Sequence, residues 1–143
     1  MILLDASALI AYLAGEPAAD RVADLLSEGG SAITSVNLAE CLDILMRVRG
    51  IDFDRLESAI VPLLVSALSI VPIGEAEARA AAVVRQERYH RVRAPLSMAD
   101  CLLLAVATLN EASIVTTDNI LASSARQQGI DVVLLPRVAR KRS

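Results

Sequence analysis

The chain has 143 residues, enough for one domain that buries a hydrophobic core without disulfide or metal staples. Hydrophobic residues make up 55% of it and the mean hydropathy is +0.51, which favours a buried sheet, an oligomer interface or both. A net charge of −3 is opposite in sign to that of a strongly basic nucleic-acid-binding protein, although acidic residues held at a metal site lower the net charge without repelling a substrate once the metal is bound.

The apolar character does not predict a membrane protein. The longest uncharged run, Ser58–Gly74, contains two prolines and falls short of the roughly 20 apolar residues that a spanning helix needs. The N-terminus has no basic segment and places Asp5 within its first apolar run, so we expect no signal peptide and a cytoplasmic protein. Cys41 and Cys101 lie in apolar helical segments and are expected to be small core residues, not a disulfide.

Strand and helix patterns alternate along the chain. In chain order we expect strand Ile2–Leu4, helices Ala6–Ala14 and Pro17–Ser27, strand Ala32–Thr34, helices Val36–Arg49 and Phe53–Ala67, strand Ser69–Pro72, helices Glu75–His90 and Ser97–Asn110, strand Ser113–Thr116, helix Ile120–Gln128 and strand Val132–Leu134. This alternation predicts an α/β fold whose parallel sheet is covered on both faces. We expect one domain over residues 1–136, followed by a basic C-terminal tail over residues 137–143.

Four acidic residues fall where this topology places its ligand-binding edge. Asp5 directly follows the first strand, and Asp118 follows the strand Ser113–Thr116 by two residues. Asp100 lies in the first turn of the preceding helix, and Glu40 lies about a turn into the helix after the second strand. Because strand carboxyl ends and helix amino ends share one edge of such a sheet, we expect these four side chains to project toward the same place.

Each acid also has a purely structural explanation. Asp5 and Asp118 could cap the helices that follow them, because aspartate is a favoured N-cap. Ser97 and Asp100 have the spacing of a capping box, although glutamate or glutamine is the usual partner. Glu40 shares a helix face with other charged residues and could be an ordinary exposed side chain.

The structural explanation is weakest for Asp100. It is the only charge between Arg93 and Glu111, and it continues an apolar helical stripe that we expect to be buried. A buried charge without a partner costs several kcal/mol, and no basic residue of this helix can pair with it. Two carboxylates about 4 Å apart repel by roughly 4 kcal/mol at an effective dielectric constant of about 20, so a cluster needs protons, arginines or a cation. Carboxylate oxygens suit Mg²⁺, whereas a solitary histidine, His90, disfavours a zinc site.

The segments that carry these acids resemble the four motifs of the PIN domain family, specifically the VapC-type toxins of bacterial toxin–antitoxin pairs. The motifs, in the family's order and spacing, are Leu4–Leu9 (LDASAL), Ser35–Glu40 (SVNLAE), Ser97–Ala105 (SMADCLLLA) and Val115–Asp118 (VTTD). The similarity spans almost the whole chain, and the ordered set is far more specific than any single motif.

The resemblance implies a parallel five-stranded sheet in an α/β/α sandwich and Mg²⁺- or Mn²⁺-dependent cleavage of RNA phosphodiester bonds. It also implies a homodimer that a small antitoxin protein inhibits. By the same carry-over Asp5, Glu40, Asp100 and Asp118 are the catalytic acids, and the hydroxyl groups of Ser7 and Thr116 support them. Thr117 stands beside Thr116, so the sequence leaves open which of the two hydroxyl groups points inward.

These residues suggest a division of labour at the site. Asp5, Asp100 and Asp118 are the expected metal ligands. Glu40 is the carboxylate that we expect to accept a proton from the attacking water, because its longer side chain reaches from deeper in its helix. The alternative is a catalytically inactive PIN-like module that binds a partner or RNA.

Other phosphate chemistries fit less well. A haloacid dehalogenase-type phosphotransferase would have a second acid two residues after Asp5, where Ser7 stands. That class and receiver-like signalling domains also need a lysine, and the only one is Lys141 in the tail. No glycine-rich nucleotide-binding motif occurs in the sequence.

Basic residues concentrate in two segments, and nearly all of them are arginines, which suit bidentate phosphate contacts. The first segment is the candidate RNA-binding surface and contains Arg85, Arg88, Arg91 and Arg93. The second contains Arg137, Arg140, Lys141 and Arg142. Both segments could equally be solvated surfaces. With no tryptophan, two tyrosines and one phenylalanine, an extended base-stacking platform is not expected, and RNA would be held mainly through its phosphates.

Overall fold

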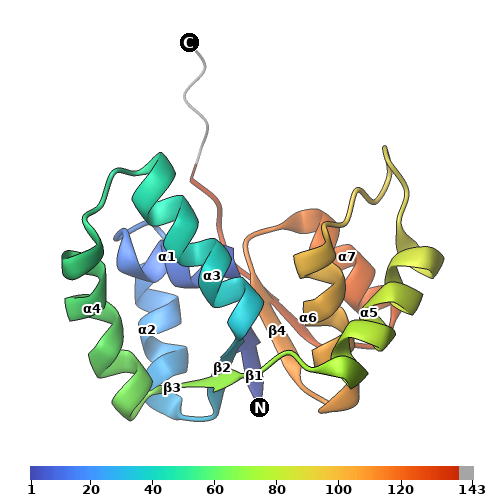
Figure 1. Ribbon diagram of the computed structural model, residues 1–143, viewed down its shortest axis with the longest axis horizontal. Coiled ribbons are helices and arrows are strands. Elements are labelled where there is room, and N and C mark those ends of the chain that lie inside the picture. Colours follow the sequence, from blue (N-terminus) through green and yellow to red (C-terminus); the bar gives the residue numbers. More distant parts are fainter. Residues whose placement is uncertain (139–143) are drawn as a thin grey trace.

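The computed structural model describes residues 1–138 (Figure 1). Its elements, in chain order, are β1 (Ile2–Leu4), α1 (Ala6–Leu13), α2 (Ala19–Glu28), β2 (Ser31–Thr34), α3 (Ser35–Asp43), a π-helical turn η1 (Ile44–Val48), α4 (Phe53–Ser66), β3 (Leu68–Val71), α5 (Glu75–Arg88), α6 (Met98–Leu109), β4 (Ser113–Thr116), α7 (Asn119–Gln127) and β5 (Val132–Leu134). The predicted alternation of strands and helices is confirmed. Arg140, Lys141 and Arg142 of the predicted basic tail lie outside the described residues.

The strands form one parallel sheet with the order β3-β2-β1-β4-β5, so β1 is central and pairs with both β2 and β4. Since every strand is parallel, all the strands end at the same edge of the sheet. The chain builds outward from β1 through β2 to β3, and then crosses to the other side of β1 to form β4 and β5. In such sheets the point where the strand order reverses is where ligands bind, and here it lies between β1 and β4.

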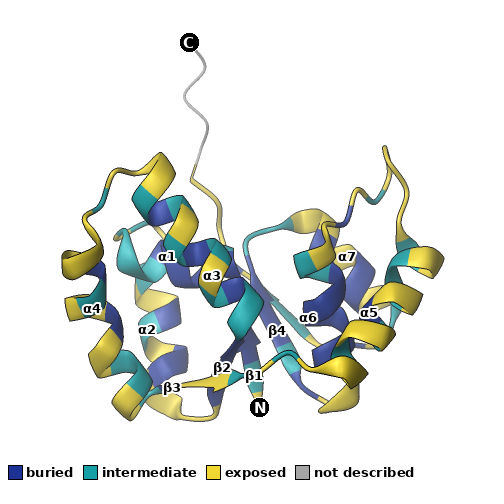
Figure 2. Cartoon of the chain, viewed as in Figure 1, coloured by how far each residue is buried: buried dark blue, intermediate teal, exposed yellow. Residues whose placement is uncertain are grey.

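Two hydrophobic cores lie on opposite faces of the sheet, because alternate strand residues point to opposite sides. Leu4, Ile33 and Val115 belong to the core packed beneath α1, α2, α3 and α4. Leu3, Ala32 and Ile114 belong to the core packed beneath α5, α6 and α7. Figure 2 shows the buried strands between these two layers of helices, which confirms the expected α/β/α sandwich.

The predicted bounds hold to within one or two residues, and one feature differs. The predicted helix Val36–Arg49 is divided into α3 and η1, where the Arg49 N–H donates to the Ile44 carbonyl five residues earlier. Gly50, at φ +67°, ends this segment as expected. Within the described residues, no helix combines the length and the hydrophobicity that crossing a membrane requires.

Candidate functional site

Asp5 is the most deeply buried of the four predicted acids. It lies at the carboxyl end of β1 and is 6% exposed. Its Oδ1 accepts a hydrogen bond from the Ala8 N–H at 2.9 Å, so the expected N-cap of α1 is present. The cap does not account for the burial, which comes from residues distant in the sequence.

Two hydroxyl groups hold the Asp5 carboxylate. Ser7 Oγ donates to Asp5 Oδ1 at 2.6 Å, and Thr116 Oγ1 donates to Asp5 Oδ2 at 2.5 Å. Each hydroxyl in turn accepts a backbone N–H: Ser7 Oγ from Thr117 at 3.0 Å and Thr116 Oγ1 from Asp118 at 2.9 Å. These bonds tie β1 to the end of β4. They also show that Thr116, rather than Thr117, has the hydroxyl directed at Asp5.

Asp100 and Asp118 are also helix caps. Asp118 Oδ1 accepts the Ile120 and Leu121 N–H groups at the start of α7. Asp100 and Ser97 form the predicted capping box, in which Asp100 Oδ2 accepts the Ser97 N–H at 3.1 Å. Both side chains are half-buried. The apolar stripe of α6 is buried from Cys101 onward, as expected, whereas Asp100 is only partly buried because the first turn of α6 lies at the open edge of the sheet.

Electrostatic effects show that the four acids act on one another. Burial raises the pKa of Asp5 from 3.8 to about 6, although its hydrogen bonds oppose the rise, and the charge of Asp100 adds to it. Burial and then the charge of Asp100 raise the pKa of Glu40. The pKa of Asp100 is raised by burial and, to a lesser degree, by Asp118. Asp100 thus lies within electrostatic reach of the other three acids.

The Cys41 thiol lies within electrostatic reach of both Asp5 and Glu40, so these two acids lie on the same side of the core. Its thiol is buried, and burial, then Glu40, then Asp5 raise its pKa to about 12. Such a thiol stays protonated at neutral pH and is not a nucleophile or a metal ligand. Cys41 and Cys101 are both free and buried, which confirms them as small core residues.

No arginine of the described residues forms an ion pair with these four acids. The ion pairs within residues 1–138 join Arg47 to Asp43, Arg49 to Glu16 and Arg79 to Glu75, and none includes the four acids. Arg47, on the helix face of Glu40, pairs with Asp43 instead. Repulsion between the acids therefore adds to burial in raising the pKa values of Asp5, Glu40 and Asp100.

The donor set fits a hard divalent cation. The helix caps use one oxygen each of Asp100 and Asp118, and within the described chain their other oxygens, and both oxygens of Glu40, accept no hydrogen bond. All these donors are carboxylates, the ligands that Mg²⁺ and Mn²⁺ favour. As they stand, no three acidic, histidine or cysteine side chains of the described residues converge into a metal-ion site.

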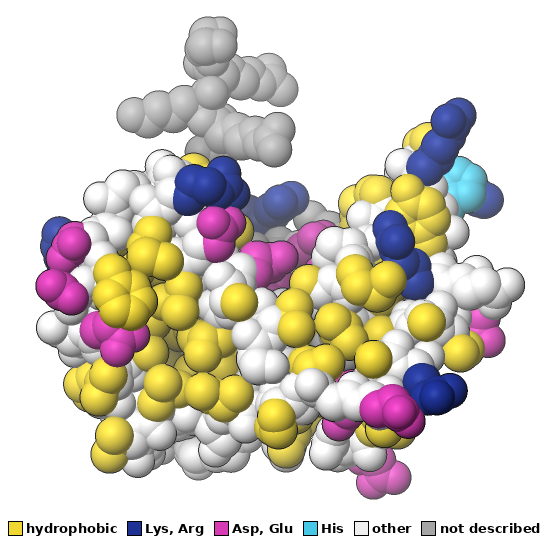
Figure 3. Space-filling view, in the orientation of Figure 1, with side chains coloured by type: hydrophobic (Ala, Val, Ile, Leu, Met, Phe, Trp, Pro, Cys, Tyr) yellow, Lys and Arg dark blue, Asp and Glu magenta, His cyan; other side chains and the backbone are white. Residues whose placement is uncertain are grey.

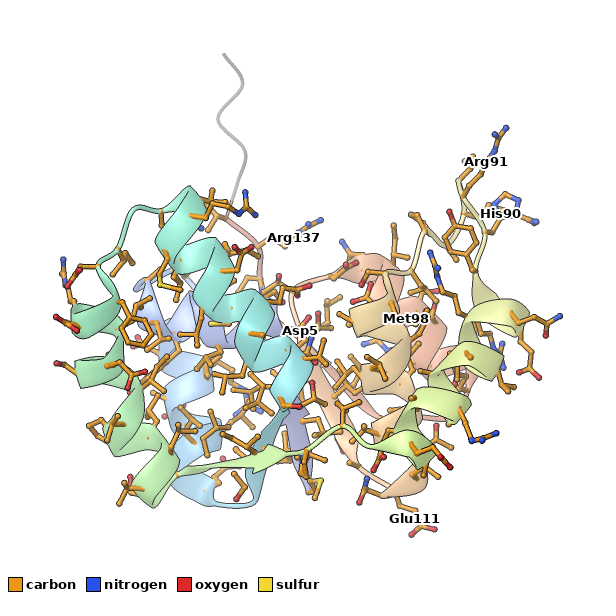
Figure 4. The ribbon with its side chains drawn as sticks, viewed as in Figure 1. Asp5, His90, Arg91, Met98, Glu111 and Arg137 are labelled. Carbon is orange, nitrogen blue, oxygen red and sulfur yellow. The ribbon has the colours of Figure 1, made fainter. Side chains whose placement is uncertain are left out.

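The acids lie in a hollow between the two helical layers. Figure 3 shows acidic side chains within the hollow at the top of the view and basic side chains on its rims. In Figure 4, Asp5 lies between the two halves of the ribbon and Arg137 lies above it. Arg137, Arg49 and Thr117 line a cavity of about 640 Å³. Thr117 lies between Thr116 and Asp118 in the sequence, so this cavity adjoins the acids.

The opposite rim contains the predicted arginine segment. Arg88 and Arg93 line a cavity of about 550 Å³ together with Asn119 and Ile120, the residues after Asp118. Arg91 lies at the tip of the loop after α5 (Figure 4). Arg85 differs from the others because its guanidinium lies over the Tyr89 ring. Arg88 and Arg93 therefore share a cavity with the two residues that follow Asp118.

Sequence reasoning missed two side chains on these rims. Arg49 and Tyr89 lie outside every motif, and each lines a cavity that also contains a neighbour of Asp118. A weak signal for Tyr89 existed in the sequence: it is an aromatic residue directly after Arg88, within the arginine segment.

Comparison with known proteins decides the family. The PIN domain matches residues 2–132 of the chain. This chain belongs to the PIN domain family. No curated protein sequence matches it.

Solved structures share this PIN-domain fold at low sequence identity. A chain of a toxin–antitoxin complex from Klebsiella pneumoniae is 19% identical, with TM-score 0.60, covering 82% of this chain and 87% of its own. A chain of VapBC2 from Rickettsia felis, bound to a promoter DNA fragment, is 17% identical, with TM-score 0.67 and coverage of 94% and 99%. Mycobacterium tuberculosis VapC20, described as a toxin that cleaves the sarcin–ricin loop, is 17% identical, with TM-score 0.65 and coverage of 87% and 95%. At these identities the likeness supports the fold of this PIN domain.

Proposed function

We propose that this PIN-domain protein is a divalent-metal-dependent endoribonuclease, the toxin of a toxin–antitoxin pair. The observation that supports the proposal is that four carboxylates lie within electrostatic reach of one another at the sheet's switch point and form no ion pair within residues 1–138. Its centre is Asp100, whose charge raises the pKa of both Asp5 and Glu40. Mutually repelling carboxylates that have no arginine partner among the described residues fit a function that adds a cation.

In this proposal each residue has a distinct role. Asp5, Asp100 and Asp118 bind Mg²⁺ or Mn²⁺, and the bound cation supplies Lewis-acid polarisation of the attacking water and of the phosphate oxygens. Ser7 and Thr116 orient the Asp5 carboxylate through their hydrogen bonds. Glu40 accepts the proton of the attacking water, because its raised pKa brings its basicity closer to neutral pH and no hydrogen bond within residues 1–138 engages its oxygens.

The direct test is incubation of the purified protein with total RNA, with Mg²⁺, with Mn²⁺ and with a chelator, followed by mapping of the cut ends. The proposal expects cleavage at discrete positions that a chelator stops. Calorimetry with Mn²⁺ tests the inactive alternative. Metal binding without cleavage of any RNA would favour a PIN-like binding module, and the absence of both would reject the proposal.

Thr116→Val should test whether the Thr116 hydroxyl positions the Asp5 carboxylate, because the variant keeps all four acids. Valine is isosteric with threonine but cannot donate a hydrogen bond to Asp5. Because the hydrogen bond from Thr116 lowers the pKa of Asp5, this pKa should rise further in the variant. Because the ionised form binds metal, the acidic limb of the pH profile of cleavage should move to higher pH, and the rate near neutral pH should fall roughly 10- to 100-fold.

The matched control for this prediction is Thr117→Val. Thr117 contributes only its backbone N–H to the network, through Ser7, so the variant should retain the wild-type profile. Equal profiles for both variants would remove the positioning role of Thr116.

The arginine rim is the proposed RNA-binding surface, through Arg88, Arg91 and Arg93, with Arg85 set apart by its contact with Tyr89. A triple variant in which Arg88, Arg91 and Arg93 are replaced by glutamine should bind RNA more weakly. The slope of its binding constant against salt concentration should fall by about one for each phosphate contact that is lost. Arg79→Gln is a suitable control, since Arg79 lies near the other end of α5 in an ion pair with Glu75. An unchanged slope in the triple variant would argue against this surface.

Protein partners form the last part of the proposal: a cognate antitoxin and a second copy of the chain, in the cytoplasm. Apolar side chains exposed on α4 and β3 support it, namely Phe53, Val61, Val65 and Ile70 (Figure 3). Val65 is 82% exposed, the most of these four side chains, and a contiguous exposed apolar patch is typical of a protein–protein interface. A homodimer on this face would be disrupted by Val65→Glu, and an unaltered sedimentation coefficient would argue against it.

A further inference from the structure

We propose that Tyr89 is a stacking site for one unpaired nucleobase of the RNA, beside the acidic site. The inference deepens the proposed nuclease function and rests on it. Tyr89 follows the last residue of α5, and its side chain is 44% exposed. A single exposed aromatic ring differs from the extended stacking platform that the composition excludes, and one ring is enough to select one base position.

One face of the Tyr89 ring is already in contact with a cation. The Arg85 guanidinium carbon lies 4.8 Å from the ring centroid, in cation–π geometry. Arg85 Nε is the one buried side-chain nitrogen or oxygen in the described residues that has no hydrogen-bond partner. Arg85 is thus held by the ring and not by a carboxylate. The exposed area of the ring is left for a second planar group.

Two cavities border Tyr89 and place it next to the site acids. One, of about 360 Å³, is also lined by Arg85 and Met98, and Met98 lies two residues before Asp100. The other, of about 550 Å³, is also lined by Asn119 and Ile120, which follow Asp118. A base on Tyr89 would therefore belong to a nucleotide close to the phosphate at the acids.

The surroundings suit each part of a nucleotide. Met98, 46% exposed, adds an apolar and polarisable wall beside the ring. Arg88 and Arg93 line the second cavity, within reach of a phosphate of the same strand. Bases of single-stranded RNA are recognised by stacking on aromatic side chains with phosphates held by arginines, whereas paired bases cannot reach such a ring.

The chain allows a direct measurement of this contact. It contains no tryptophan and two tyrosines, Tyr12 and Tyr89. In a Tyr12→Phe variant Tyr89 is the only tyrosine, so its fluorescence reports on that ring alone. We expect single-stranded oligoadenylate, added with a chelator so that no cleavage occurs, to quench this fluorescence. Quenching that is absent at saturating RNA, while binding is detected by anisotropy of a labelled oligonucleotide, would overturn the inference.

Affinity provides a second measurement with a matched pair. Tyr89→Leu should weaken oligoadenylate binding roughly 5- to 100-fold, whereas Tyr89→Phe, which keeps the ring, should bind like the wild type. Equal affinities of the two variants would overturn the inference. Because both measurements are made without cleavage, they remain decisive if the nuclease proposal fails, and cleavage by a protein that shows no quenching would reject the stacking site alone.

Discussion

Asp5→Asn is expected to abolish RNA cleavage while leaving the fold at least as stable as the wild type. The substitution removes a proposed metal ligand at the centre of the hydroxyl network but keeps its shape and an oxygen for the Ala8 and Ser7 hydrogen bonds. Residues that merely orient metal ligands contribute roughly 10- to 100-fold, so loss of the ligand should lower the cleavage rate by more than about 100-fold.

The stability of this variant should depend on pH in a defined direction. The pKa of Asp5 is about 6 in the folded protein, above its ordinary value of 3.8, because burial disfavours the charged form. Between these pH values the folded state holds more protons than the unfolded state, so the contribution of Asp5 to stability is complete below about pH 4 and is lost as pH rises through 6. The loss amounts to roughly 3 kcal/mol.

Asparagine does not titrate, so Asp5→Asn should escape this loss. We expect denaturant unfolding, with a chelator present, to give the variant a higher free energy of unfolding than the wild type. This difference should grow by up to roughly 3 kcal/mol between about pH 4 and pH 8. Asp24→Asn, at an exposed position on α2, is the control and should match the wild type at every pH. Retained cleavage, or a variant that loses stability as pH rises, would contradict the assignment of Asp5.

The sequence predicted the elements of the fold because each is locally encoded. Strand and helix periodicities, the caps at Asp5 and Asp118 and the terminating Gly50 all lie within the segments that they define. Alternation also predicted a parallel sheet, whereas the strand order β3-β2-β1-β4-β5 was not predicted and comes from the structure. The division into α3 and η1 was not predictable, because α-helix and π-helix share the same apolar pattern.

Burial at the site was harder to predict, because it depends on residues that the sequence separates. From the sequence Asp5 could be an ordinary N-cap, yet its carboxylate also accepts a hydrogen bond from the hydroxyl of Thr116, 111 positions away. The apolar stripe of α6 was predicted correctly to be buried, but the sequence did not show that Asp100, in the first turn, is only partly buried at the edge of the sheet. Capping and clustering were treated as alternatives, whereas the same carboxylates do both. A cap fixes one oxygen of the carboxylate and leaves the other for the site.

Asp100→Asn should be the most informative single change, because Asp100 acts on the other acids. Removing its charge should lower the pKa of both Asp5 and Glu40, since Asp100 raises each of them. Carboxyl titration by NMR measures this fall directly. Cleavage should fall by more than about 100-fold, as for Asp5, because a proposed metal ligand is lost. The helix cap should persist, since asparagine keeps an oxygen that can accept the Ser97 N–H.

Ser97→Ala is the reciprocal control for that prediction. It removes the hydroxyl that accepts the Asp100 N–H at 3.0 Å, so the free energy of unfolding should fall by about 1 kcal/mol. Because the Asp100 carboxylate remains and still accepts the Ser97 backbone N–H, cleavage should stay within a few-fold of the wild-type rate. Asp100→Asn should therefore lose activity and keep its stability, whereas Ser97→Ala should lose stability and keep its activity. If Asp100→Asn instead lost stability and kept its cleavage rate, Asp100 would be a structural cap and the proposed metal site would lose its centre.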